Sequence, residues 1–244
     1  MNLYSLVGKR VEAAGPIRVG VIGAGKFASM FLTQATVSPW IHVVGVADIN
    51  VPKARDALKR TGWAEERYAA ASIAEALAKG TTAVVDNADA VLTEPRIEVI
   101  LEITGNPIFG TVHAAKAIEN GKHVIMVNVE ADCMLGPILA RKAEAAGVVY
   151  AMAYGDQPAL ICEMVDWART CGFDIVAAGK GTKYLPEYNY STPDTIWDHW
   201  GFTKEQLATG DYNAQMFNSF LDGTKSAIEM TAVANGTGLM PQDE

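Results

Sequence analysis

One sequence feature limits the possible folds of this chain more than any other. It is an apolar, β-branched run that breaks into a glycine turn and is followed by a helix pattern. It reads IRVGVIGAGKFASMFLTQA from Ile17, and Gly23, Gly25 and Ala28 fit the spacing G-x-G-x-x-G/A. The first glycine permits the turn, the second lets a pyrophosphate approach the backbone, and the small third residue lets helix and strand pack closely. Glycine turns after strands are common, so the spacing by itself is weak. With its context it predicts a dinucleotide site at Gly23, Gly25, Lys26, Phe27 and Ala28.

A second apolar run, IHVVGVAD, ends at Asp48, which is where such a site places an acidic residue for the adenosine ribose. The alternative is a helix cap ahead of Pro52. A carboxylate at this position favours NAD(H), because it repels the extra phosphate of NADP(H). Lys53 and Arg55 follow closely enough to offset that preference, so the sequence leaves the choice between NAD(H) and NADP(H) open.

Strand and helix patterns then alternate through IEVILEITG, NPIFGTVHAAKAIENG, KHVIMVN, LGPILARKAEAAG and VVYAMAYG. This order predicts an α/β fold with a doubly wound parallel sheet of the Rossmann type. Ligands bind at the carboxyl edge of such sheets. The residues expected there, facing the nicotinamide, are Thr104, Gly105, Asn106, Asn128 and Glu130.

Three histidines in this half suggest no site. His42 and His123 open strand patterns and His113 falls inside a helix pattern, without the spacing of metal ligands. We interpret all three as structural. The Ala-rich stretch between the second and third strand patterns, helical in its first part, is assigned no chemistry.

The composition changes after Tyr154, and we expect three parts: an N-terminal arm at 1–15, a Rossmann domain at 16–153 and a partial α+β substrate domain at 154–244. Asp156 would lie at a strand's carboxyl edge beside the cofactor, or else act as a plain helix N-cap. The run FDIVAAGKGTKYL reads as a strand entering a glycine turn that carries Lys180 and Lys183, which could bind a phosphate or carboxylate.

The loop after this turn is rich in aromatic residues. Its rings either cover a pocket or pack on one another, and the sequence does not decide between these. They are Tyr184, Tyr188, Tyr190, Trp197 and Trp200.

Asp222, Lys225 and Glu229 are the charged residues of an otherwise apolar and polar stretch between Ala214 and Met240. Their offsets place all three on one face of a helix that looks largely buried. Buried charges tend to be paired, ligand-bound or catalytic, because an isolated one is costly to desolvate. We expect a catalytic set, unless Gly223 marks the start of the helix and makes Asp222 a cap.

Bulk composition excludes several classes of function. The formal net charge is -8 and no basic run occurs, which argues against binding to nucleic acid or an anionic membrane surface. No apolar stretch reaches the ~18 residues of a membrane span, and three unpatterned cysteines suggest a reducing compartment. The expected location is the cytoplasm.

Six segments, VIGAGKFA, LEITGNP, GKHVIMVN, AYGDQPAL, GKGTKYLPEYN and DGTKSAIEM, together resemble homoserine dehydrogenase-like oxidoreductases. The closest resemblance is to the 1-deoxy-D-xylulose 5-phosphate reductoisomerase-like branch, and it spans Ile17 to Pro241. It implies rearrangement of a ketose phosphate to 2-C-methyl-D-erythritol 4-phosphate, an isoprenoid precursor, with reduction by NADPH and a divalent ion, Mg²⁺ or Mn²⁺. Members of this branch continue into a SAF-type domain, which implies that this chain is truncated at its C-terminus.

Departures from homoserine dehydrogenase change the expected chemistry. Asn128-Val129 replaces an Asn-Lys pair, and Asp156 replaces a glycine, and both departures argue against homoserine as the substrate. By resemblance, Asp222 and Lys225 would polarise a carbonyl and relay a proton. The catalytic set implied is Lys225, Asp222, Lys183, Glu229 and Asp156, with Asp156, Glu130 and Glu229 as possible metal ligands.

The sequence thus predicts an NAD(P)-dependent oxidoreductase that acts on a small-molecule substrate. A homo-oligomer is expected only because such assemblies are common among soluble proteins. The specific reading is a reductoisomerase. The alternatives are a homoserine dehydrogenase-like or sugar-acid or polyol dehydrogenase, and a dinucleotide-binding sensor without turnover.

Overall fold

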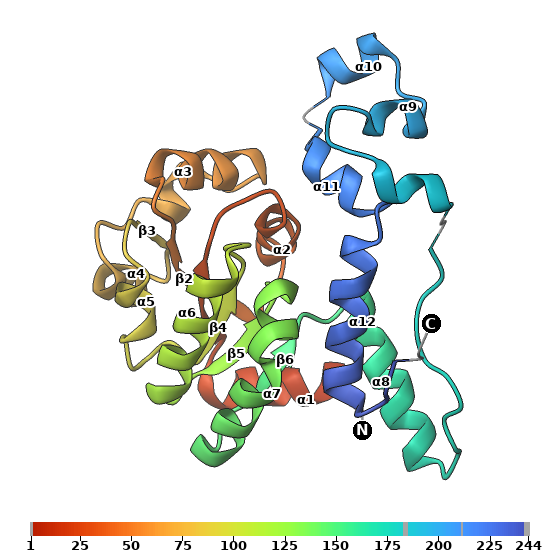
Figure 1. Cartoon of the computed structure of the whole chain (residues 1–244). Coiled ribbons are helices and arrows are strands. Elements are labelled where there is room, and N and C mark those ends of the chain that lie inside the picture. Colours follow the sequence, from red (N-terminus) through yellow and green to blue (C-terminus); the bar gives the residue numbers. More distant parts are fainter. Residues whose placement is uncertain (1, 183–184, 211, 242–244) are drawn as a thin grey trace. The chain divides into compact units, whose positions relative to one another are not determined.

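A computed structural model describes residues 2–182, 185–210 and 212–241 of the chain (Figure 1). The chain folds into two compact units, Met1–Ala153 and Tyr154–Glu244. Each unit is described by itself.

The first unit is built on one sheet whose strands all run parallel to their neighbours. The strand order is β3-β2-β1-β4-β5-β6, so the connection reverses direction between β1 and β4. This is the doubly wound order, and it confirms the predicted Rossmann fold. The strands are β1 Ile17–Ile22, β2 Ile41–Ala47, β3 Ala83–Val85, β4 Val99–Glu102, β5 His123–Met126 and β6 Tyr150–Met152.

Helices cover both faces of this sheet, and two buried clusters record this. One cluster joins the sheet to α2 and α3 around Leu32 and Leu58, and the other joins it to the helices after β3 around Ile118 and Leu139. Because both faces are buried, the central strands are continuous apolar runs rather than alternating ones. The helical elements of this unit are α1 Leu3–Ala14, α2 Ala28–Ala35, α3 Val51–Arg60, η1 Glu65–Tyr68, α4 Ile73–Lys79, α5 Asp89–Leu92, α6 Pro107–Glu119 and α7 Val129–Ala146.

Asparagine caps start the helices that follow β2, β4 and β5. The side chains of Asn50, Asn106 and Asn128 each accept a hydrogen bond from a backbone N–H in the first turn of the next helix. Proline follows the first two of these caps within the first helical turn. Caps and prolines stop each helix from starting earlier, so the strand ends and connecting loops stay free to form a site.

The named elements of the second unit are all helices within its described residues, although the sequence suggested a mixed α+β domain. The segment expected to be a strand, 173–182, is irregular there because no neighbouring strand supplies hydrogen bonds to its backbone. Helices α8 and α12 pack side by side (Figure 1). The elements of this unit are α8 Gln157–Thr170, η2 Pro186–Tyr190, α9 Ile196–Trp200, α10 Lys204–Thr209, α11 Ala214–Ser219 and α12 Thr224–Thr237.

The aromatic side chains of the second unit form a small core of their own. Trp197 and Trp200 each lie 5.3 Å, centroid to centroid, from the ring of Phe217. Tyr188 and Ile196 are buried in the same cluster. Of the two interpretations open for the loop aromatics, packing on one another describes Tyr188, Trp197 and Trp200, whereas Tyr190 is 86% exposed; Tyr184 lies outside the described residues.

Among the described residues, no helix is both long and apolar enough to span a membrane.

Candidate functional site

The glycine turn after β1 has the geometry that a dinucleotide site needs. Gly23 has φ +97°, and a Cβ there would lie 2.9 Å from the carbonyl oxygen of Ile103, so only glycine fits. A Cβ at Gly25 would meet nothing within 4 Å, which leaves room for a ligand against the backbone. Ala28 is fully buried at the start of α2, as the small third position requires.

Asp48 lies directly after β2 and reaches the same turn. Its Oδ2 accepts a hydrogen bond from the Ala24 N–H and its Oδ1 one from the Asn50 N–H, both at 2.8 Å. The helix cap ahead of Pro52 is Asn50, not Asp48, so the alternative role weighed for Asp48 is wrong. Asp48 remains half-buried beside the turn, where an adenosine ribose would lie.

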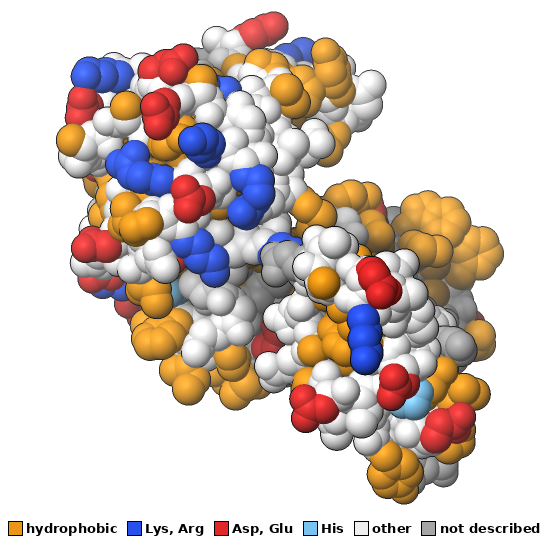
Figure 2. All heavy atoms as spheres, turned by 90° about the horizontal axis from the view of Figure 1, so that it is seen from above, with side chains coloured by type: hydrophobic (Ala, Val, Ile, Leu, Met, Phe, Trp, Pro, Cys, Tyr) orange, Lys and Arg blue, Asp and Glu red, His pale blue; other side chains and the backbone are white. Residues whose placement is uncertain are grey.

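Lys53 and Arg55, the two basic residues that left the choice between NAD(H) and NADP(H) open, both lie on α3. Both are exposed; Arg55 also donates to the Tyr68 carbonyl oxygen at 3.4 Å and lies over that ring, and Lys53 lies in the first turn of α3. Figure 2 shows Lys and Arg side chains gathered on this side of the first unit. α3 contributes Lys53, Arg55, Lys59 and Arg60.

Residues at the ends of β4 and β5 hold one another. Asn128 is only 2% exposed, and its side chain caps α7 and donates to the Asn106 carbonyl oxygen at 2.9 Å. Asn106 in turn caps α6. Thr104 and Gly105 precede it, the latter with φ +70°. Asn128 therefore supports the loop at Thr104–Asn106 and has no side-chain surface to offer a nicotinamide.

The sequence patterns did not predict a buried polar cluster that lies beneath α6 and α7. Glu102 ends β4 with a fully buried carboxylate, and its Oε1 accepts from the Thr104 hydroxyl at 2.6 Å and lies 3.2 Å from His113 Nδ1. The sequence does carry a sign of this cluster, because a glutamate at the end of a buried strand needs partners for its charge. His113 is thus a structural partner, as expected, while His123 accepts from the Val149 N–H.

Asp132 and Tyr150 extend this cluster. The Tyr150 hydroxyl donates to Asp132 Oδ1 at 2.8 Å. Burial raises the pKa of the Asp132 carboxyl, and the hydrogen bond from Tyr150 opposes that shift only in part. Burial also raises the pKa of the Tyr150 hydroxyl, with the charges of Asp132 and Glu102 adding to the effect. Both environments therefore favour the neutral form more than water does.

In the second unit, the expectation of one helical face for Asp222, Lys225 and Glu229 is wrong for its first member. α12 begins at Thr224 with Gly223, at φ +88°, as its N-cap. Asp222 lies ahead of the helix, where its Oδ1 accepts from the Thr224 N–H and hydroxyl and its Oδ2 from the Asn218 amide. Asp222 therefore closes the helix N-terminus, as the alternative reading held.

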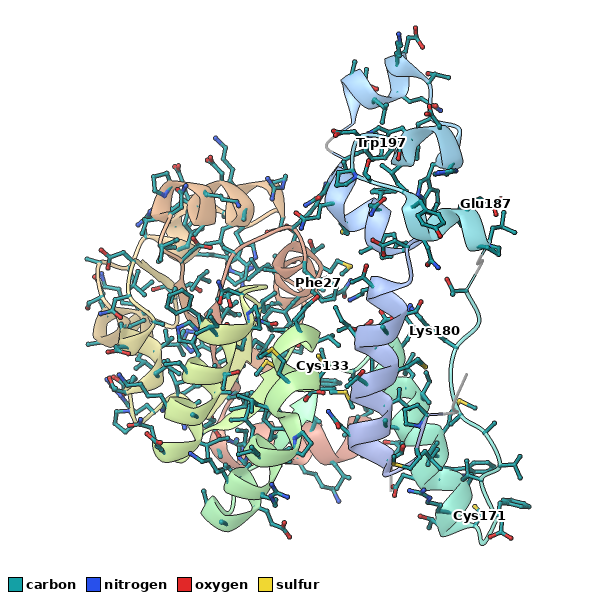
Figure 3. The ribbon with its side chains drawn as sticks, viewed as in Figure 1. Phe27, Cys133, Cys171, Lys180, Glu187 and Trp197 are labelled. Atoms are coloured by element: carbon teal, nitrogen blue, oxygen red, sulfur yellow. The ribbon has the colours of Figure 1, made fainter. Side chains whose placement is uncertain are left out.

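Glu229 is the buried charge of α12, with 1% exposure. Its Oε2 forms an ion pair with the ammonium of Lys180, which comes from the irregular segment before η2. Its Oε1 lies 3.6 Å from the Lys225 ammonium, one helical turn back. Two lysines thus converge on one carboxylate (Figure 3 labels Lys180 beside α12).

The neighbouring charges of Lys225 and Asp156 act on Lys180. Desolvation lowers the pKa of the Lys180 ammonium, the charge of Lys225 lowers it further, and the carboxylate of Asp156 opposes the shift. Asp156 is the N-cap of α8, and its Oδ1 accepts from the Gln157 N–H at 3.0 Å. The N-cap role and an electrostatic role beside Lys180 therefore coexist in Asp156.

The remaining candidates divide as follows. Lys183 lies outside the described residues. Glu130 lies in the first turn of α7 in the first unit, whereas Asp156 and Glu229 belong to the second. No three His, Cys, Asp or Glu side chains gather to hold a metal within 2–182, 185–210 and 212–241. Both oxygens of Glu229 face lysine ammonium groups, which do not fit a cation site.

A groove of about 540 Å³ runs along α12 in the second unit. One wall is the irregular segment that ends at Lys180, and the other is α12 with the residues that follow it. Its lining is Val176, Ala177, Ala178, Gly179, Lys180, Met230, Val233, Ala234, Leu239, Met240 and Pro241.

The chain matches two families, one for each unit. Residues 17–126 match the oxidoreductase family with an NAD-binding Rossmann fold, and residues 155–244 match the catalytic domain of oxidoreductase DRL. A homoserine dehydrogenase of Methylobacillus glycogenes is 28% identical over 118 residues, or 47% of this chain. That stretch spans only 24% of the relative's own length.

Solved structures also align with the chain. A homoserine dehydrogenase from Thiobacillus denitrificans aligns with a TM-score of 0.47 at 19% identity, over 64% of this chain and 34% of that one. An NAD-binding oxidoreductase from Klebsiella pneumoniae aligns with a TM-score of 0.45 at 18% identity, over 72% and 44%. The glycine turn and the strand order agree with the first of these family matches, an NAD-binding Rossmann fold.

Proposed function

We propose that this chain carries the cofactor-binding and substrate-handling residues of a dehydrogenase that interconverts a hydroxyl and a carbonyl group on a small molecule. The observation that carries the proposal is the buried Glu229 carboxylate with two lysines on it, in the segment that matches an oxidoreductase catalytic domain. Such a cluster offers preorganised positive charge where an alkoxide develops.

The first unit would hold the nicotinamide cofactor. The open space at Gly25, the close approach at Gly23 and the carboxylate of Asp48 fit a dinucleotide. When bound, the nicotinamide donates or accepts the hydride. The proposed contacts are Gly23, Gly25, Lys26, Phe27, Ala28 and Asp48 for the dinucleotide, and Thr104, Gly105 and Asn106 for the nicotinamide end.

The second unit would hold the substrate. Lys225 and Lys180 each keep ammonium protons that Glu229 does not use, since an ammonium has three donors. These protons can stabilise the oxygen of a carbonyl while its carbon is reduced. The negative charge of Asp156 partly offsets the positive charge at Lys180. Asp222 would not contact the substrate and would contribute only by capping the start of α12.

Hydride exchange is better supported than rearrangement of a sugar phosphate. A reductoisomerase reaction would use a divalent ion to hold two adjacent substrate oxygens. Glu229, one of the carboxylates expected to bind that ion, instead engages two lysines. Conversion of 1-deoxy-D-xylulose 5-phosphate is therefore the second reaction to test.

An absorbance assay of NADH and NADPH separates these readings. The purified chain would be given 1-deoxy-D-xylulose 5-phosphate with and without Mn²⁺, and in parallel homoserine, polyols and sugar acids with the oxidised cofactors. Turnover of a hydroxy compound without added metal supports the dehydrogenase. Turnover of the sugar phosphate that requires Mn²⁺ overturns it in favour of the reductoisomerase. Tight cofactor binding with no turnover indicates a sensor.

A further inference from the structure

The groove along α12 combines an aliphatic lining with one cationic end. Its described lining carries a single charged side chain, that of Lys180, and otherwise small or aliphatic residues such as Val233 and Ala234. Lys225, Asp222 and Asp156 are not among its lining residues. Of the Glu229, Lys180 and Lys225 group, it is therefore Lys180 whose charge a molecule in the groove contacts.

The position of Lys180 is set by its neighbours rather than by a regular element. The ion pair with Glu229 ties residue 180 to the middle of α12. A Cβ at Gly179 would come within 3.4 Å of Met230 Sδ, so the segment runs close against the helix there. The Glu229 side chain is 2% exposed and that of Lys180 is 20% exposed, and Lys180 is one of the residues that line the groove.

We propose that Lys180 contacts the reacting oxygen of the substrate and protonates it, while the groove takes an aliphatic portion of the same molecule. This rests on the proposed dehydrogenase function. The substrate class is accordingly an aliphatic carbonyl compound or its alcohol. A phosphate group within the groove would find no second cation among the described lining residues.

Reduction of the carbonyl transfers one hydride to carbon and one proton from Lys180 to oxygen. As the carbonyl carbon gains the hydride, the C=O π bond breaks and its electron pair stays on oxygen. An N–H bond of Lys180 breaks, its proton forms the O–H bond, and Lys180 is left as a neutral amine that regains a proton from water. In the direction of oxidation the same amine accepts the hydroxyl proton.

Two substitutions separate proton transfer from simple charge. Lys180→Met removes both, whereas Lys180→Arg keeps a cation for Glu229 but holds its proton too tightly to donate it. We expect both to lower kcat about 100-fold or more with straight-chain aldehydes, with unchanged affinity for NADPH. Lys204→Met, an exposed lysine of α10, is the matched control and should leave kcat unchanged.

A kcat within about threefold of wild type for Lys180→Met overturns the catalytic role, since loss of a general acid costs far more. Loss of kcat in Lys180→Met with full activity in Lys180→Arg overturns the proton transfer and leaves charge stabilisation. Faster turnover of glyceraldehyde 3-phosphate than of straight-chain aldehydes overturns the substrate class.

A second measurement needs no turnover. Acetic anhydride labelling of lysines, read by mass spectrometry, would be compared with and without hexanoate, whose carboxylate and chain imitate the proposed ligand. We expect hexanoate to protect Lys180 in the wild type and not in Ala234→Phe, which fills the groove. If no carbonyl substrate is turned over, the proposed function fails, and protection still decides on the groove. No protection, or equal protection in Ala234→Phe, overturns it.

Discussion

The ammonium group of Lys180 forms an ion pair with the carboxylate of Glu229, which is only 1% exposed on α12. The two residues lie far apart in sequence and belong to different kinds of structure, an irregular segment and a helix. Lys225 approaches the other oxygen of the same carboxylate. This one buried charge thus organises the positive end of the proposed substrate site.

Glu229→Gln should loosen the contact between the irregular segment and α12. It removes the charge that both lysines share, and breaking a buried ion pair costs several kcal/mol; because the lysines are partly exposed, we expect about 1–3 kcal/mol. Hydrogen exchange at the amides of α12 would measure the loss. Glu187→Gln, an exposed glutamate of η2, is the control. Equal exchange in the two variants would show that the pair does not hold the segment.

Gly23→Ala should damage both folding and cofactor binding. The added methyl would lie 2.9 Å from the Ile103 carbonyl oxygen at a φ of +97°, a strain of about 1–3 kcal/mol. Gly25→Ala is the matched variant, because its methyl enters open space. We expect it to keep the thermal stability but to weaken NAD(P)H binding, measured by fluorescence titration. Unchanged binding in Gly25→Ala would move the pyrophosphate away from this turn.

Asp48→Ser should shift the cofactor preference toward NADPH. The substitution removes the negative charge that opposes a 2′-phosphate, while exposed Lys53 and Lys59 keep their positive charge nearby on α3. We expect the ratio of the Kd for NADPH to that for NADH to fall by about tenfold or more, since like charges in contact cost several kcal/mol. Asp56→Asn on α3 is the control. An unchanged ratio would place the ribose away from Asp48.

Asp132→Asn should stabilise the first unit at neutral pH. Burial raises the pKa of Asp132 in the folded state above its ordinary value of 3.8, so the folded protein binds the proton more tightly than the unfolded chain. The contribution of Asp132 is therefore fully present below pH 3.8 and is lost as pH rises through the raised pKa. Asparagine can still accept from the Tyr150 hydroxyl without a charge.

Urea unfolding between pH 4 and pH 8, followed by a probe in the first unit, tests this. The free energy of unfolding should fall less with rising pH in Asp132→Asn than in the wild type. A parallel decline in both proteins would mean that other groups govern the pH dependence.

Local sequence patterns determined the first unit almost completely. The turn with Gly23, Gly25 and Ala28, the acidic residue Asp48 and the alternation of strands and helices are all short-range signals, and they suffice because a Rossmann unit repeats one local arrangement. The edge strand β3, Ala83–Val85, was missed. Three residues within an Ala-rich stretch carry too little periodicity to indicate a strand.

In the second unit, the tertiary structure decided that Lys180 meets Glu229. Spacing along α12 brought Lys225 and Glu229 together, because residues four apart share a helical face. The same rule misplaced Asp222, since Gly223 starts the helix after it. The rule also gave no sign of Lys180, because a contact between an irregular segment and a helix depends on how the chain returns on itself. Local propensity does not encode that return; the burial of Glu229, and its need for a partner, selects it.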